Sequence, residues 1–265
     1  MRSVVLSALV AAALAGAPAA TAQEDEGQRL QKCYDRIDRD PEGAYQDGLT
    51  WLSLGNRPAA RHCTALALIA LGQEAEGASR LEELANAPDA GGIEERGVYL
   101  AQSGNAWLLA GMPAEAIVTL TNAMKLRPSD YELYKDRARA HVLQKKWGDA
   151  AKDLDMAITM AAGDAEAHRL RGLSRLKLNR LSDAWADVEA AMKLAPTDVK
   201  VLVLRGDVRE AMRLQGIEDH HVSSRKRPST PPAASLRVNR GAVRDPPRQR
   251  DNLTLDPGPR YARPG

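Results

Sequence analysis

The sequence predicts an all-α protein, arranged as a solenoid of antiparallel helix pairs, and three observations carry the prediction. Phe is absent and aromatic residues make up only 4% of the 265 residues, so a core must be built mainly from Leu, Ala, Val and Met, which suits closely packed helices far better than sheets. The same residue types recur every 34 residues over 97–198. Asp and Pro residues also lie where the helices of such units would begin.

Residues 1–22 have the pattern of an export signal. Arg2 precedes an uncharged stretch rich in Val, Leu and Ala, which ends in Ala-Thr-Ala at residues 20–22; this is the order of a cleaved secretory signal. The strongly apolar part stops near Leu14, short of the roughly 20 residues that span a bilayer. We therefore expect cleavage, a mature chain without a transmembrane segment, and a periplasmic location, with secretion as the alternative.

The next segment, residues 23–92, is predicted as two degenerate helix pairs. Asp40 and Pro41 separate the first two helices, because Asp caps a helix and Pro fits its first turn. Gly72 marks the turn of the second pair. The four helices are expected over residues 23–39, 42–54, 58–71 and 74–87.

Cys33 and Cys63 are the only cysteines, and an even count in an oxidising compartment favours a disulfide. Each lies in the first helix of its pair, about one repeat apart, so neighbouring parallel helices would bring them together. The bridge would staple the end of the solenoid that has no preceding neighbour. Two buried free thiols are the alternative. No metal site is expected, since two thiols are too few and no His has a ligand spacing to them.

Residues 97–198 align with themselves as three consecutive units of 34 residues without a gap. Small residues recur at positions 8, 20 and 27 of the unit, a bulky apolar residue at position 24, and Pro at position 32 of two units. In unit order these residues are Gly104, Ala138 and Gly172; Ala116, Ala150 and Ala184; Leu120, Leu154 and Val188; Ala123, Ala157 and Ala191; and Pro128, Ala162 and Pro196. Two antiparallel helices need this pattern to pack closely and turn into the next pair.

This stretch resembles the tetratricopeptide repeat (TPR) family. Trp107 lies where the family usually has Tyr, and Gly111 lies at the turn between the helices. The fourth position departs from the family's Trp, being Leu100, Tyr134 and His168 in the three units. The resemblance implies an α-solenoid, with a TPR array over 93–216. Its last element, 199–214, repeats the first helix of a fourth unit and is expected to cap the array alone.

The composition changes from residue 217 onward. Residues 217–265 contain eight Pro and ten Lys or Arg against five Asp or Glu, and cannot support a core, so we expect a disordered tail. The positive net charge of the chain belongs to this tail and to Arg2, because residues 23–216 carry a net charge of −4. A genuine basic linker and the product of a shifted reading frame are both open interpretations.

No nucleotide-binding loop, nucleophile elbow or metalloprotease motif is present. His220 and His221 lie in the predicted tail without further ligands, while His141 and His168 lie at packing positions of first helices. The sequence therefore predicts no catalytic residues, no metal and no cofactor, and the chain is not expected to be an enzyme.

Charged residues recur in the same units. Arg137, Arg171 and Arg205 occupy position 7 of successive units, and Asp153 and Asp187 occupy position 23. The unit that lacks the Arg also lacks the Asp. Because a buried charge needs a partner, we interpret these residues as Arg–Asp pairs between packed helices rather than as a ligand site.

The resemblance implies a binding surface on the concave face formed by the first helices. The family's concave positions select Asn105, Leu108, Leu109, Lys135, Arg139, Val142, Arg169, Leu173 and Leu176, with Val98, Ala101, Glu132, Glu166 and Lys177 beside them. The face is apolar toward Asn105 and basic around Lys135, Arg139 and Arg169, which suits a peptide with an acidic group. The family's carboxylate clamp is only partly matched, because Arg139 replaces the usual Asn and Leu170 replaces a basic residue.

These features together predict a periplasmic adaptor or scaffold that binds a protein segment and performs no chemistry. The alternative is a structural subunit of an envelope assembly, tethered by the basic tail to anionic lipid or an acidic polymer. No nucleic-acid partner is expected, because export separates the basic tail from nucleic acid.

Overall fold

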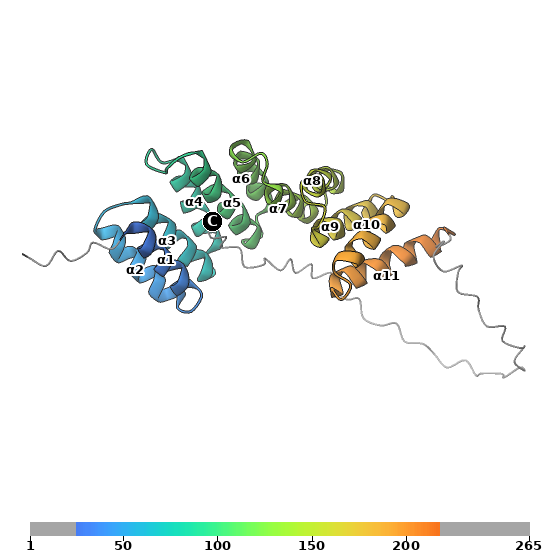
Figure 1. Ribbon diagram of the computed structural model, residues 1–265, viewed down its shortest axis with the longest axis horizontal. Helices are drawn as coiled ribbons and strands as arrows, with labels where there is room; N and C mark the ends of the chain where they lie inside the picture. The colour runs from blue at the N-terminus through green and yellow to red at the C-terminus, as the bar shows by residue number, and fades with distance from the viewer. Residues whose placement is uncertain (1–24, 218–265) are drawn as a thin grey trace, which may run out of the picture.

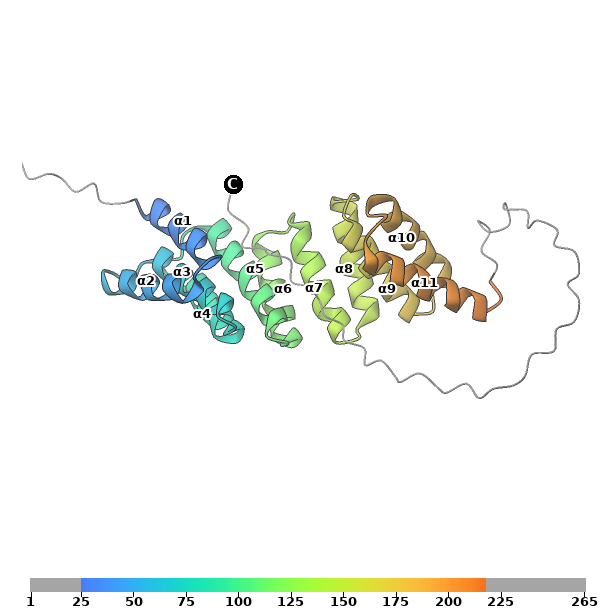
Figure 2. The same ribbon diagram turned by 90° about the horizontal axis from the view of Figure 1, so that it is seen from below.

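A computed structural model describes residues 25–217, which form eleven α-helices and no strand in that part of the chain. The helices lie side by side in chain order, from Glu26–Ile37 (α1) at one end of an elongated array to Val199–Leu214 (α11) at the other (Figures 1 and 2). The predicted all-α solenoid is confirmed. The expected signal (1–22), nearly all of the expected tail (217–265) and the pair His220–His221 lie outside the described residues.

Within residues 25–217, five helix pairs precede the single helix α11. The other helices are α2 Pro41–Ser53, α3 Pro58–Ala70, α4 Glu74–Asn86, α5 Ile93–Leu109, α6 Pro113–Leu126, α7 Tyr131–Leu143, α8 Trp147–Met160, α9 Ala165–Lys177 and α10 Leu181–Leu194. Each helix packs against its neighbours in the chain, and the first helices of successive pairs also touch, as expected of a solenoid.

Aspartates start several helices as the sequence predicts. The Asp40 side chain accepts a hydrogen bond from the Gly43 N–H at 2.9 Å, and Asp164 accepts one from the Ala167 N–H at 3.0 Å. Each bond satisfies a donor in the first turn that has no partner within the helix.

Helix α5 begins at Ile93, four residues before the first 34-residue unit. The Gly92 N–H donates to the Glu95 carboxylate at 2.9 Å, which is the half of a capping box that a glycine at the N-cap can form. Arg96 also donates to the carbonyls of Ala85 and Ala87, at 2.7 and 2.8 Å. Arg96 thereby holds the long α4–α5 connection in place. The extra turn at the start of α5 thus depends on Glu95 and Arg96, which both precede the first 34-residue unit.

The turns inside the last three pairs share one backbone conformation. Gly111, Lys145 and Asn179, which all occupy position 15 of the unit, have positive φ angles of 69°, 57° and 59°. The next N–H bonds back to a carbonyl of the first helix, as from Met112 to Trp107 at 2.9 Å, which is the Schellman motif. Only the first of these turns carries the glycine that normally indicates such a conformation.

The recurring small residues form the packing interfaces of the array. The alanines at positions 20 and 27 and the apolar residues at position 24 are fully buried in all three units. A Cβ atom added to Gly104 would come within 2.5 Å of the Leu120 Cγ, so position 8 must be small where it faces a leucine of its own pair. The close packing inferred from the repeat is therefore present.

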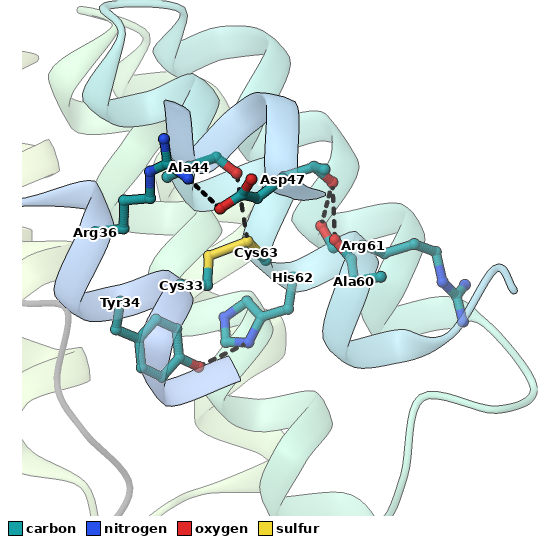
Figure 3. Close-up of a disulfide and its surroundings, with 10 residues drawn as sticks. Cys33, Tyr34, Arg36, Ala44, Asp47, Ala60, Arg61, His62 and Cys63 are labelled. Atoms are coloured by element: carbon teal, nitrogen blue, oxygen red, sulfur yellow. Dashed lines mark hydrogen bonds and ion pairs between the residues drawn. A yellow bond between two sulfur atoms is a disulfide. The ribbon is translucent and has the colours of Figure 1, made fainter. Parts of the chain in front are cut away.

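The N-terminal end of the array is cross-linked as predicted. Cys33 of α1 and Cys63 of α3 form a disulfide across a Cα–Cα distance of 6.0 Å (Figure 3). Both cysteines are buried within one apolar cluster that also contains Ile37, Trp51 and Leu81. The bridge therefore joins the first helices of the first two pairs through the core of this end.

Candidate functional site on the first helices

The candidate binding surface lies on α5, α7 and α9, which follow one side of the array, with α6 and α8 toward the other (Figure 1). We call it the first-helix face. It consists of the nine residues that the sequence selects: Asn105, Leu108, Leu109, Lys135, Arg139, Val142, Arg169, Leu173 and Leu176.

A buried carboxylate organises the centre of this face. Asp136 of α7 accepts a hydrogen bond from the Asn105 Nδ2 of α5 at 2.9 Å and one from the Arg139 Nη1 at 2.7 Å. Burial raises the pKa of Asp136, and the guanidinium of Arg139 partly opposes this change. The Arg139 side chain is 16% exposed. Of its guanidinium nitrogens, only Nη1 is hydrogen-bonded within the described part of the chain. Its remaining N–H groups are donors that a ligand oxygen can use.

Lys135 is buried and already paired. Its Nζ contacts the carboxylate of Asp164 and lies 3.0 Å from Glu132, with the Tyr131 ring centroid 5.4 Å away. Burial alone would raise the pKa of Asp164, but hydrogen bonds from Lys135 and from the Ala167 N–H outweigh it and lower that pKa. Lys135 therefore fastens α7 to the start of α9 rather than offering an open charge.

Arg169 and Val142 also lie largely inside the array. Arg169 donates two hydrogen bonds to Glu166, at 2.6 and 2.7 Å, in a bidentate pair, and Val142 is buried. Leu109 is the predicted residue that solvent reaches most, with 40% of its surface exposed, while Leu108, Leu173 and Leu176 are partly buried. The open part of the face is thus mainly apolar, with Asn105 and Arg139 as its polar groups.

Sequence reasoning missed the acids that neutralise this face. Asp136 occupies position 6 of its unit, where the other units have Gln102 and Leu170, so no repeat pattern singles it out. Asp164 has the sequence signal of a helix cap, which it is, but its contact with Lys135 depends on the close approach of two successive units.

The predicted Arg–Asp pairs lie behind this face. Arg137 donates to Asp153 at 2.8 and 2.6 Å, and Arg171 donates to Asp187 at 3.0 and 2.6 Å. The interpretation as pairs between packed helices is confirmed for both units.

The same arginines also reach the preceding unit. Arg171 Nη1 donates to Asp155 at 2.8 Å, and Arg137 Nη1 donates to Thr121 at 3.0 Å. Each guanidinium therefore bridges the second helix of its own pair and that of the pair before it. His141 and His168 lie beside the acceptor aspartates, with nitrogen–oxygen separations of 3.7 and 3.6 Å.

Two further findings bear on what this part of the chain can do. Within residues 25–217 no group of three or more His, Cys, Asp or Glu side chains is arranged to hold a metal ion. No helix there is long and apolar enough to cross a membrane.

Known structures resemble this arrangement. A MamA structure is 19% identical over 60% of this chain and 88% of its own, with a TM-score of 0.52. A second one, the RS-1 double mutant of MamA, is 15% identical over 65% of this chain and 96% of its own, with a TM-score of 0.55. These values, together with the 34-residue helix pairs, decide the fold. The chain has the tetratricopeptide-repeat fold.

Among other TPR structures, the first TPR domain of RPAP3, bound to the HSP90 peptide SRMEEVD, is 26% identical over 44% of this chain and 93% of its own. Its TM-score is 0.43. No protein-family profile and no curated protein matches the sequence.

Proposed function

We propose that this TPR chain is a non-enzymatic adaptor that binds a segment of another protein on the first-helix face. The observation that carries the proposal is Arg139, whose guanidinium is oriented by the buried Asp136 and keeps N–H donors for a ligand. A preoriented cation loses less conformational entropy on binding than a free surface arginine.

The ion pairs made by Lys135 and Arg169 indicate which kind of ligand suits the first-helix face. Lys135 and Arg169 are each neutralised by carboxylates of the chain, so a strongly acidic peptide has little excess charge to meet. An apolar segment that places a single carboxylate or carbonyl oxygen at Arg139 suits the face better. Its apolar side chains would cover Leu109 and the partly buried leucines.

We propose no catalytic activity because the three histidines that the structure describes make contacts typical of structural residues. His62 is buried, with its two ring nitrogens 3.1 Å from the Tyr34 hydroxyl and 2.6 Å from the Gln102 Oε1. His141 and His168 pack beside the Arg–Asp pairs. All three imidazoles therefore contact residues inside the array, which supports a structural role for them.

Export is part of the proposal. It is supported by the signal pattern of residues 1–22 and by the Cys33–Cys63 disulfide, because disulfides form and persist in oxidising compartments such as the periplasm.

The test is affinity capture from a periplasmic extract, with bound proteins identified by mass spectrometry. The bait is the full chain, compared with a variant that carries Leu109→Asp and Lys177→Glu. Both changed residues are exposed. Leu109 belongs to the first-helix face and Lys177 occupies a concave position beside it, so the variant alters this surface without breaking its internal ion pairs. We expect the variant to lose the captured partner.

A matched control carries the same chemical changes on a second helix, Met156→Asp and Lys152→Glu in α8, where both side chains are exposed. It should capture the partner like the unmodified chain. Equal capture by all three baits would refute binding at the first-helix face. Capture that disappears when the chain is ended after residue 217 would instead favour tethering by the tail.

A further inference from the structure

Helix α11 packs against α10, the second helix of the preceding pair, but within the described part of the chain no second helix of its own pair follows it. In α5, α7 and α9, positions 4, 7, 8 and 11 of the unit face the second helices. In α11 those positions are Leu202, Arg205, Gly206 and Arg209. We call these four residues the α11 seat.

The seat repeats a sequence that binds an acidic helix elsewhere in the same molecule. Residues 170–175 of α9 read Leu-Arg-Gly-Leu-Ser-Arg, and residues 204–209 of α11 read Leu-Arg-Gly-Asp-Val-Arg. In α9, Arg171 and Arg175 both donate to Asp187 of α10, at 2.6 and 2.8 Å for their shortest bonds. A Cβ atom on Gly172 would come within 3.1 Å of the Asp187 Cβ. This pattern therefore admits a closely packed helix and neutralises its carboxylate.

In α11 the part of this surface around Leu202, Arg205 and Gly206 is open. A Cβ atom added to Gly206 would meet nothing within 4 Å, and Arg205 forms no hydrogen bond or ion pair with the described residues. Leu202 is 36% exposed, whereas Leu100 at the same position of the first unit is 8% exposed. Val203 beside it is 57% exposed. Leu202 and Val203 therefore give an exposed apolar edge to a surface that the arginines make polar.

Charge decides which occupant fits. Residues 217–265 carry ten Lys or Arg against five Asp or Glu, so the net charge of the chain's own continuation has the same sign as Arg205 and does not complement it. A second copy pairing through its own α11 would bring the Arg205 side chains of the two copies together. Like charges brought together at an interface disfavour association. A helix from a different protein that carries a carboxylate has the complementary charge.

We propose that the α11 seat binds an acidic amphipathic helix of another protein, with a small residue against Gly206 and a carboxylate against Arg205. The bound helix occupies the place of the missing second helix and extends the array by one pair. The site is separate from the first-helix face, which leaves each surface free to bind its own partner.

The probe that tests the seat is a fluorescent synthetic peptide with the sequence of α10, residues 181–194, which supplies Ala184, Asp187 and Ala191 in the required spacing. Fluorescence anisotropy with the full chain should show saturable binding. Gly206→Leu, which has room within the chain but fills the seat, should weaken binding at least tenfold, as should Arg205→Glu. Lys200→Glu makes the same charge reversal on the opposite side of α11 and should leave the affinity unchanged.

A charge swap separates the proposal from loss of folding. A peptide with Asp187→Arg should bind poorly to the unmodified chain and regain affinity for the Arg205→Glu variant, which a misfolded protein could not do. Absence of saturable binding, or equal affinity of all the variants, would overturn the proposal. Binding that appears only when the chain is ended after residue 217 would identify the tail as the occupant, and self-association abolished by Gly206→Leu would identify a second copy. Either result would also overturn it.

Discussion

His62 is a buried histidine that holds three helices of the N-terminal half together. With its ring neutral, Nδ1 accepts a hydrogen bond from the Tyr34 hydroxyl of α1 at 3.1 Å, and Nε2 donates to the Gln102 Oε1 of α5 at 2.6 Å. The Tyr99 ring packs edge-on at 4.8 Å. Burial lowers the pKa of His62 to about 4, although the hydrogen bond to Gln102 opposes the change. Figure 3 shows the Tyr34–His62 contact beside the disulfide.

This histidine makes stability depend on pH in a defined window. Between its unfolded pKa of about 6.5 and its folded pKa of about 4, the unfolded chain binds a proton that the folded chain does not. The free energy of unfolding should therefore fall as the pH falls through this window, by up to about 1.4 kcal/mol per pH unit. Urea unfolding at a series of pH values measures it.

The comparison is with a His62→Asn variant, which is expected to be less stable at pH 7 but to lose this pH dependence. Carboxylates with lowered pKa values, such as Asp40 and Asp89, contribute equally to both proteins at lower pH. Parallel stability curves for the two proteins between pH 6.5 and 4 would contradict the assignment.

At the scale of the helices, the Arg–Asp pairs join successive helices to one another. Asp187 of α10 is buried and accepts hydrogen bonds from two residues of α9, Arg171 and Arg175. Both arginines also contact Asp155 of α8. Three consecutive helices thus share one charged cluster, and its members are mutually compensated within the low-dielectric interior.

Asp187→Ala should lower stability strongly, because it leaves two largely buried guanidinium groups without their central acceptor. The expected loss is about 3–5 kcal/mol, read as a lower midpoint of thermal unfolding by circular dichroism. Asp183→Ala is the matched control in the same helix: its ion pair with Arg180 is exposed, and its removal should change stability by less than about 0.5 kcal/mol. An unchanged midpoint for Asp187→Ala would show that the pairs do not hold the helices together.

At the scale of the whole molecule, the array is open-ended and each pair is supported mainly by its neighbours. Among the described residues, the first pair, α1 and α2, has a neighbouring pair on only one side. The disulfide between α1 and α3 compensates for this by closing a sequence separation of 30 residues. At the other end α11 has no such link among the described residues.

Removing the disulfide should therefore destabilise the N-terminal end first. A Cys33→Ala, Cys63→Ala variant should lose about 3–4 kcal/mol in the chain-entropy account, measured by denaturant unfolding. Hydrogen exchange should rise in α1 and α2 before it rises in α9 and α10. The same loss should appear when the unmodified chain is treated with dithiothreitol. Uniform exchange rates along the array, or an unchanged denaturation midpoint, would contradict a local staple.

Much of this architecture is readable from the sequence, because repeat packing leaves a periodic record. The small residues at positions 8, 20 and 27 predict the helix pairs, and the repeated Arg137–Asp153 and Arg171–Asp187 spacing predicts their ion pairs. Turn conformation was less readable: Lys145 and Asn179 adopt the left-handed conformation without a glycine signal. There the hydrogen bonds of the helix end impose the conformation that the residue type disfavours.

The helix pairs, their order and the cysteine pairing can be predicted from the amino-acid sequence, since each depends on a repeat or on residues about one repeat apart. Which charges remain open, in contrast, becomes evident only from the three-dimensional arrangement of the helices. Lys135 and Arg169 look like surface cations in the sequence, yet both are neutralised by nearby acids. Arg205, in contrast, forms no ion pair with the described residues. The physical reason is that the charge available to a ligand depends on burial and on distances between side chains of different units, and neither quantity is periodic along the chain.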